Sequence, residues 1–136
     1  MNLEAIMKPK PMTVAPDETM NVAIRKMKEQ NFKHLPVVDR SGELVGVLSD
    51  RDLKRASPSD ATLLEVHELL YLLEKVKVSQ VMTKKPITAP PDITVAAAAA
   101  LMVKHKIGCL PVVGSGKLLG IVTQTDFLNY LAQNNK

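Results

Sequence analysis

A hydroxyl residue followed three positions later by an aspartate occurs twice in this chain directly after an apolar segment that contains a glycine. The pairs are Ser49 with Asp52 and Thr123 with Asp126. Both stand where a helix is expected to begin, and the free N–H groups of a helix start favour anions. A carboxylate can accept both hydroxyls of a cis-diol such as ribose. The pattern predicts a ribose at Asp52 or Asp126 and a phosphate near the helix start, with ordinary helix capping as the alternative.

The two pairs belong to a longer internal repeat. Leu-Pro-Val-Val precedes each pair, at 35–38 and at 110–113. Equivalent residues of the two repeats, such as Thr13 and Thr88, lie 75 positions apart. This separation shortens to 74 at the aspartates, because the intervening turn loses one residue. A repeat at a fixed period indicates one structural unit used twice. Its recurrence in register makes the ribose prediction stronger than a single pair would.

Local patterns predict the elements that position these residues. Apolar side chains at helical spacing favour helices, and β-branched runs on either side of a turn favour a hairpin. Each repeat therefore predicts the order β-α-β-β-α, which gives an α+β fold. The first repeat is expected to have a helix capped by Thr19 over 19–30, strands over 35–38 and 44–48, and a short helix from 50. The second is expected to have a helix over 95–106, capped by Thr94, and a final helix over 124–132.

The segment between the repeats, 61–76, has no counterpart elsewhere in the chain. Its apolar residues, from Leu63 to Val76, recur at helical spacing and form a wide stripe. The sequence predicts a connecting helix there. Packing of this helix inside its own chain and packing against a second subunit are both open.

Composition restricts the class of protein. The chain has 136 residues, of which 46% are hydrophobic, so one compact domain with a buried core is expected. Aromatic residues make up 3%, which argues against base stacking on single-stranded nucleic acid. The net charge of +4 comes from scattered residues, and no helix-turn-helix pattern is visible. Nucleic acid is therefore not an expected partner, and attraction of phosphorylated ligands is the alternative to a solvated surface.

Cysteine and histidine usage argues against an enzyme or a metal site. Cys109 is the single cysteine, which indicates a reducing compartment, and its neighbour His105 lacks an orienting group for nucleophilic catalysis. No metal-ligand spacing is present. The longest apolar run, 95–103, is too short to span a bilayer. We expect a cytoplasmic, non-catalytic protein without a membrane segment.

The chain resembles a tandem pair of CBS domains, also called a Bateman module, over nearly all its length. The residues that carry the resemblance are 34–39 with 46–52 and 109–113 with 120–126. The resemblance implies two β-α-β-β-α repeats packed as one pseudo-two-fold module. Repeat 1 is expected over 1–56, the connecting helix over 57–77 and repeat 2 over 78–136. The inter-repeat segment resembles stand-alone acetoin-utilisation (AcuB-type) CBS proteins.

The resemblance also implies a function. Such modules bind AMP, ADP, ATP, S-adenosylmethionine or related adenosine ligands in two pockets of the cleft between the repeats, and they regulate a partner without catalysis. No cofactor is required, the regulated partner is not identified, and a homodimer is expected. The alternative is an interaction scaffold that has lost ligand binding.

The family's binding residues map onto matching positions of this chain. The ribose-binding aspartate corresponds to Asp52 and Asp126, and its hydroxyl partner to Ser49 and Thr123. Further matches are Val47 and Ile121 beside the base, Thr13 and Thr88 at the adenine edge through their backbone, Lys8 and Thr83 near ribose or phosphate, and Lys33 and His34, opposite Gly108 and Cys109, near phosphates.

The two halves of the predicted site are not equivalent. Arg51 aligns with Thr125, and Lys33 and His34 align with the neutral pair 108–109. A cation beside a phosphate strengthens its hydrogen bonds, so we expect unequal affinities, with one half better suited to multiply phosphorylated ligands. Which half this is stays open. Arg51 as a solvated surface residue and His34 as a half-buried structural residue are the alternatives to phosphate contacts.

Overall fold

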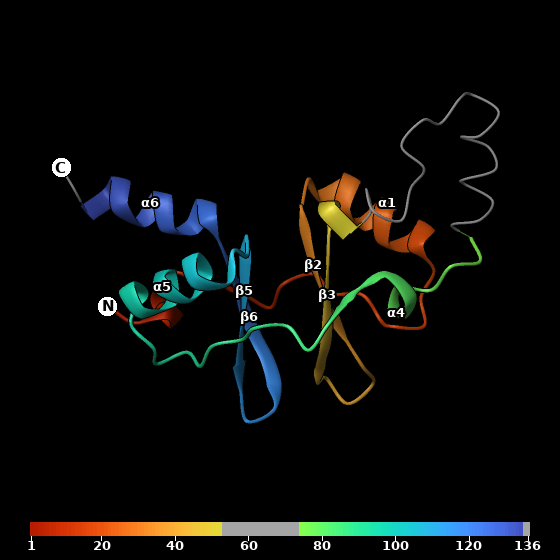
Figure 1. Cartoon of the computed structure of the whole chain (residues 1–136), viewed down its shortest axis with the longest axis horizontal. Coiled ribbons are helices and arrows are strands. Elements are labelled where there is room, and N and C mark those ends of the chain that lie inside the picture. The colour runs from red at the N-terminus through yellow and green to blue at the C-terminus, as the bar shows by residue number, and fades with distance from the viewer. Residues whose placement is uncertain (53–73, 135–136) are drawn as a thin grey trace. The chain divides into compact units, whose positions relative to one another are not determined.

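The computed structural model describes residues 1–52 and 74–134, and it divides the chain into two compact units (Figure 1). Unit 1 consists of Met1–Pro11 and Ile87–Lys136, and unit 2 of Met12–Pro86. This division differs from that of the sequence repeats. Each unit combines the lead-in of one repeat with the helix and hairpin of the other. The predicted repeat boundaries, at 56 and 77, remain a prediction.

Unit 2 is built on a three-stranded antiparallel sheet with the strand order β2-β3-β4. The middle strand is flanked by its hairpin partner on one side and by the short strand from the second lead-in on the other. The extended residue Val14 also forms a parallel bridge with Val37. The elements are α1 (Met20–Gln30), β2 (His34–Val38), β3 (Leu44–Ser49), α4 (Val78–Val81) and β4 (Thr83–Lys84), with helical residues 50–52 after β3.

Unit 1 repeats this plan with the strand order β1-β6-β5, also antiparallel. Its first strand comes from the first lead-in, and Ala89 forms the parallel bridge to Val112. The elements are the 3-10 helix η1 (Leu3–Ala5), β1 (Lys8–Pro9), α5 (Val95–His105), β5 (Cys109–Gly114), β6 (Lys117–Thr123) and α6 (Gln124–Asn134).

The structure confirms both predicted hairpins, both repeat-opening helices and the helix at the end of the chain. The extended pieces before α1 and α5 pair through single bridges and form no longer strands. Most of the predicted connecting helix, 61–76, lies outside the described residues. Its last part is not helical, because Glu74 and Lys75 form a turn and Val76 has no regular structure.

Each unit has its own aliphatic core. In the repeated Leu-Pro-Val-Val strands, Leu35 and Val37 in β2 and Leu110 and Val112 in β5 are fully buried. Methionines from the helices, Met20 and Met27 in unit 2 and Met102 in unit 1, fill the space against these strands. Among residues 1–52 and 74–134, no helix is both long enough and apolar enough to cross a bilayer.

The two repeat-opening helices begin and end in comparable ways. Thr94 caps α5, because its hydroxyl oxygen accepts the N–H of Ala97 at 3.1 Å. Thr19 holds the same position before α1, but its side chain makes no capping hydrogen bond. Both helices end in a left-handed residue, Asn31 with φ 55° and Lys106 with φ 54°. Asparagine adopts this conformation more readily than lysine does.

Replacing Lys106 with glycine should therefore stabilise the protein by about 1 kcal/mol, because glycine removes the Cβ clash of the left-handed conformation. Urea denaturation of the wild type and Lys106→Gly measures the difference. Asn31→Gly is the matched control and should give a smaller gain. An unchanged or lower unfolding midpoint for Lys106→Gly would contradict the expectation.

Candidate functional site

In unit 2 the predicted hydroxyl and carboxylate form the start of a helix. Ser49 ends β3, and Asp52 lies three residues later with 4% of its surface exposed. The Asp52 Oδ2 atom accepts the Ser49 N–H at 2.8 Å and the Ser49 hydroxyl at 3.0 Å. The Asp52 N–H in turn donates to Ser49 Oγ at 3.2 Å. This reciprocal pair is a capping box, so the capping interpretation of the motif is correct for one carboxylate oxygen.

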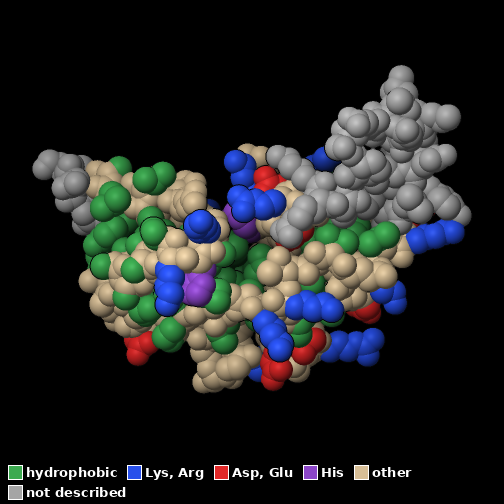
Figure 2. Space-filling view, in the orientation of Figure 1, with side chains coloured by type: hydrophobic (Ala, Val, Ile, Leu, Met, Phe, Trp, Pro, Cys, Tyr) green, Lys and Arg blue, Asp and Glu red, His purple; other side chains and the backbone are tan. Residues whose placement is uncertain are grey.

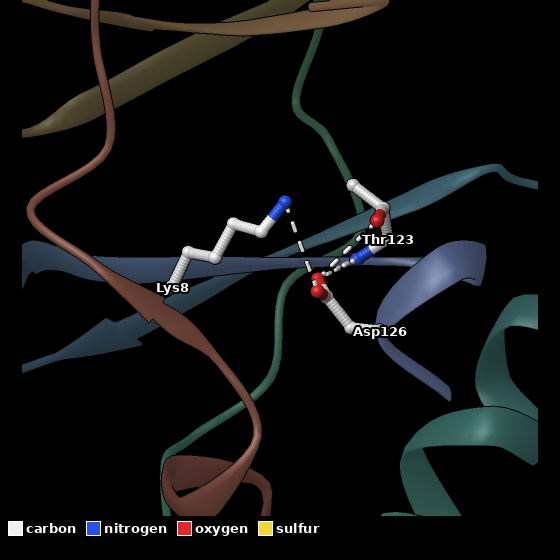
Figure 3. Close-up of polar contacts among 3 residues, drawn as sticks. All are labelled: Lys8, Thr123 and Asp126. Atoms are coloured by element: carbon white, nitrogen blue, oxygen red, sulfur yellow. Dashed lines mark hydrogen bonds and ion pairs between the residues drawn. The ribbon is translucent and has the colours of Figure 1, made fainter. Parts of the chain in front are cut away.

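Unit 1 has the same two contacts to the carboxylate at the start of α6 (Figure 3). Asp126 Oδ2 accepts the Thr123 N–H at 2.9 Å and the Thr123 hydroxyl at 3.2 Å. Asp126 is 9% exposed. In both units, therefore, Oδ2 stabilises the helix start, and the question of function concerns the other oxygen, Oδ1.

The Oδ1 atoms face residues from the lead-in strands. The Thr83 hydroxyl donates to Asp52 Oδ1 at 3.3 Å. The Lys8 ammonium lies 3.8 Å from Asp126 Oδ1, and Figure 3 shows its side chain extending from the lead-in strand toward the carboxylate. Lys8 and Thr83 are equivalent positions of the two repeats. Each site thus combines a lead-in residue of one repeat with the hydroxyl–aspartate pair of the other.

Glycine in the repeated motif permits this close approach. A Cβ at Gly46 would lie 2.9 Å from the Thr83 carbonyl oxygen, and one at Gly120 would lie 2.7 Å from the Lys8 carbonyl oxygen. Methionine sulfurs from the lead-ins lie against both positions as well. Because a backbone oxygen cannot move aside as a flexible side chain can, any larger residue here would push the lead-in strand away.

The predicted residues beside the base divide between the units. Val47 is buried and lies opposite Thr83 in the β3–β4 register, and Ile121 is buried and lies opposite Lys8 in the β1–β6 register. The base-edge candidates divide in the same way: Thr13 belongs to unit 2 and the exposed Thr88 to unit 1. The Thr13 carbonyl accepts a hydrogen bond from Lys26 Nζ at 2.9 Å, which the sequence pattern did not predict.

His34 is partly buried beside the hydroxyl of the Asp52 site, opposite Ser49 in the β2–β3 register. Burial lowers the pKa of His34 below its usual value, against the attraction of Asp50 and Asp52. The nearby charges of Lys33 and Arg51 lower the pKa further. The imidazole is therefore more readily neutral than a histidine in water.

The other phosphate candidates differ in exposure. Lys33 and Arg51 are exposed. Cys109 is buried and lies opposite Thr123 in the β5–β6 register, which is the position that His34 takes in unit 2. The two units therefore present different chemistry at equivalent points around similar aspartates.

A family model of the CBS domain matches residues 3–59 and 78–133. The chain belongs to the CBS domain family. Its fold is the α+β fold of this family, with two CBS repeats forming a CBS pair. The matched segments contain both hydroxyl–aspartate motifs and both lead-in strands.

Among curated proteins, a CBS domain-containing protein of Dictyostelium discoideum is 37% identical over 120 residues, which cover 88% of this chain and 83% of the relative. The inosine-5'-monophosphate dehydrogenase of Aquifex aeolicus is 35% identical over 120 residues. That alignment covers 87% of this chain but only 22% of the enzyme. The similarity to the dehydrogenase therefore concerns about a fifth of its length.

Solved structures support the predicted relationship to CBS-pair proteins. CBSX2 in complex with AMP is 30% identical, with a TM-score of 0.81 and coverage of 99% of both chains. An acetoin utilisation protein (AcuB) from Vibrio cholerae is 31% identical, with a TM-score of 0.79 and coverage of 100% of this chain and 98% of its own. The CBS domain pair of protein MJ0100 in complex with 5'-methylthioadenosine and S-adenosyl-L-methionine is 26% identical, with a TM-score of 0.82 and coverage of 99% and 98%.

Gly120→Ala should destabilise the protein by about 1–3 kcal/mol, because the added methyl group meets the Lys8 carbonyl and separates β1 from β6. Gly114→Ala is the matched control, since its Cβ would come closest to the end of the flexible Leu119 side chain. Urea denaturation compares the two variants. Equal, small effects would show that the lead-in contact does not require glycine.

The lowered pKa of His34 has a consequence for stability. The unfolded state binds a proton more readily than the folded state, so stability is fully present above the unfolded pKa of 6.5 and declines as the pH falls toward the folded pKa. His34→Gln should reduce the loss in urea midpoint between pH 7.5 and 5.5. His105→Gln, on the exposed end of α5, should leave this loss unchanged. Equal pH dependence in wild type and His34→Gln would contradict the prediction.

Proposed function

We propose that this chain is a non-catalytic regulatory module that binds adenosine-containing ligands, such as AMP, ADP, ATP or S-adenosylmethionine, at Asp52 and Asp126. The observation that carries the proposal is that the two oxygens of each carboxylate have different partners. Oδ2 of each aspartate serves the helix start through contacts of 2.8–3.2 Å. Oδ1 faces a lead-in side chain at 3.3 Å in one unit and 3.8 Å in the other.

The longer contacts of Oδ1 suit an exchangeable partner. A ribose hydroxyl that donates to Oδ1 replaces a long contact with a short, charge-assisted hydrogen bond. The capping box is untouched by this exchange, so the helix start retains its hydrogen bonds. The free N–H groups of the same helix start would favour a phosphate attached to that ribose.

The solved relatives support adenosine as the common part of the ligand. The structure of CBSX2 holds AMP, and that of the MJ0100 domain pair holds 5'-methylthioadenosine and S-adenosyl-L-methionine. These ligands share an adenosine group and differ in their charge. The proposal therefore places ribose recognition at the aspartates, and it assigns charge selection to the surrounding residues, which differ between the units.

Ligand binding would act on a partner through the lead-in segments. A ligand held between Lys8 and Asp126 would tie the first lead-in more firmly to the hairpin of the second repeat. It can shift the state of a partner protein only by its difference in affinity for the two states of the module. No enzymatic step is required of any residue in this scheme.

Self-association is a second candidate function, and exposed apolar residues on unit 1 favour it. Val103 in α5 is 77% exposed, and Leu128 and Leu131 in α6 are 65% and 53% exposed. Figure 2 shows hydrophobic side chains gathered over the unit that carries these helices. A homodimer that covers these residues would account for their exposure.

If such a homodimer forms, Leu128→Glu should lower the molar mass measured by light scattering. An unchanged molar mass would show that these residues do not lie in the interface.

Isothermal titration calorimetry with AMP, ADP, ATP and S-adenosylmethionine tests the main proposal on wild type, Asp52→Asn and Asp126→Asn. Asparagine keeps one acceptor oxygen for the capping contacts, and its amide nitrogen then takes the place of Oδ1, where it cannot accept a ribose hydroxyl. Each variant should lose binding in its own half by at least about tenfold. An absence of heat with all four ligands, for a folded wild type of unchanged molar mass, would favour the scaffold function instead.

A further inference from the structure

The two lead-in side chains that face Oδ1 stand at equivalent positions and differ in charge. Lys8 in β1 and Thr83 in β4 each lie opposite the apolar residue that follows the motif glycine. The Lys8 ammonium is 3.8 Å from Asp126 Oδ1, whereas the Thr83 hydroxyl donates to Asp52 Oδ1 at 3.3 Å. The carboxylate therefore faces a cation from the lead-in at one site and a neutral donor at the other.

The contact between Lys8 and Asp126 is suited to exchange. The Lys8 side chain is 58% exposed, whereas that of Asp126 is 9% exposed and is held by the Thr123 contacts to Oδ2. The ammonium lies beyond hydrogen-bond distance from Oδ1, and it is carried on a flexible four-carbon chain. A ligand hydroxyl that takes Oδ1 therefore displaces the ammonium only slightly and leaves it beside the ligand (Figure 3).

The displaced ammonium acts on the charge of the ligand. Ribose hydroxyls are neutral, so the group attached to the ribose decides whether the ligand is an anion. Attraction between opposite charges falls only inversely with distance, and salt screens it beyond about 8 Å at physiological ionic strength. Because a 5'-phosphate and the cis-diol belong to one sugar ring, a flexible ammonium beside the diol comes within this distance of the phosphate. Lys8 therefore offsets the repulsion between the phosphate and Asp126.

At the Asp52 site the equivalent lead-in side chain contributes no charge. The charged groups that act on the adjacent His34 are two of each sign: Lys33, Arg51, Asp50 and Asp52. A phosphate bound here meets no added cation from the position that Lys8 occupies in unit 1. The repulsion by the Asp52 carboxylate is then left to the exposed Lys33 and Arg51, which are more strongly screened by solvent.

We propose that Lys8 makes the Asp126 site selective for adenosine ligands with a 5'-phosphate, and that Thr83 lets the Asp52 site accept ligands without one. This inference rests on the proposed function, in which Oδ1 of each aspartate binds the ribose. Lys8 competes with the ribose for Oδ1, which lowers the affinity for an uncharged nucleoside. The same ammonium forms charge-assisted contacts with a phosphate, which raises the affinity for a nucleotide. Both effects favour the phosphorylated ligand.

Adenosine and AMP test the inference, because they differ only in the 5'-phosphate. Calorimetric titration of Asp52→Asn measures the Asp126 site alone, and the ratio of the adenosine to the AMP dissociation constant expresses its selectivity. Adding Lys8→Thr introduces the residue found at the equivalent position 83. The ratio should fall about tenfold on this change.

Lys10→Asn is the matched control, because it removes an exposed positive charge from the same lead-in. Asparagine tolerates the left-handed backbone of Lys10, with φ 48°. In Asp52→Asn this change should alter the ratio by less than about twofold, since an exposed charge without a place at Oδ1 is largely screened. The reciprocal change, Thr83→Lys in Asp126→Asn, should raise the ratio at the Asp52 site.

The outcomes separate this inference from the proposed function. A ratio that Lys8→Thr leaves unchanged, or that Lys10→Asn lowers equally, overturns the assignment to Lys8 and leaves the adenosine-binding function intact. Absence of binding for both ligands in the wild type and in every variant overturns both. If circular dichroism shows that Thr83→Lys is unfolded, Lys8→Thr with its control decides.

Discussion

The close contact between lead-in backbone and motif glycine is the constraint on which both sites depend. Gly46 and Gly120 let a two-residue strand lie against the middle strand of each sheet, with a carbonyl oxygen 2.9 Å or 2.7 Å from the point where a Cβ would stand. That strand carries Thr83 or Lys8 to Oδ1 of the aspartate. Without the glycine, the residue that completes each site could not reach it. The exchange of lead-ins between the repeats therefore depends on local packing at these glycines.

Under the proposed function, each aspartate side chain serves both stability and binding. A buried carboxylate needs hydrogen bonds, and the capping box supplies them at Oδ2 whether or not a ligand is present. The remaining oxygen can then exchange partners without uncovering the helix start. This arrangement explains why the motif resembles ordinary helix capping in the sequence. The capping and ribose-binding interpretations assign different oxygens of the same group and do not exclude each other.

The sequence predicted the parts of the fold whose signals are local. Periodic apolar residues and turn chemistry located α1, α5 and both hairpins, because each of these elements is specified within about a dozen neighbouring residues. The composition of the units was not predictable in this way. Strands β1 and β4 have two residues each, which is too short for any periodic pattern, and their partners are distant in the chain.

The candidate site, too, was predictable only where its signals are local. The pairing of Ser49 with Asp52 followed from spacing alone. The contact of Lys8 with Asp126 depends on the lead-in exchange, and the family resemblance implied only that Lys8 lies near ribose or phosphate. Lys26 had no signal in the sequence, because a lysine beside the buried Met27 looks like the polar side of an amphipathic helix. Its hydrogen bond to the Thr13 carbonyl could not be predicted, because a backbone direction cannot be inferred from residue types.

The two candidate sites have the same hydroxyl–aspartate pair and differ in the residues around it. Lys8 at the Asp126 pair corresponds to Thr83 at the Asp52 pair, and Cys109 corresponds to His34, while the hydroxyl–carboxylate pair is retained in both units. Under the proposed function, a shared sugar with different attached groups accounts for both facts. It requires the same chemistry at the aspartate and different chemistry wherever the base or the phosphates meet the protein.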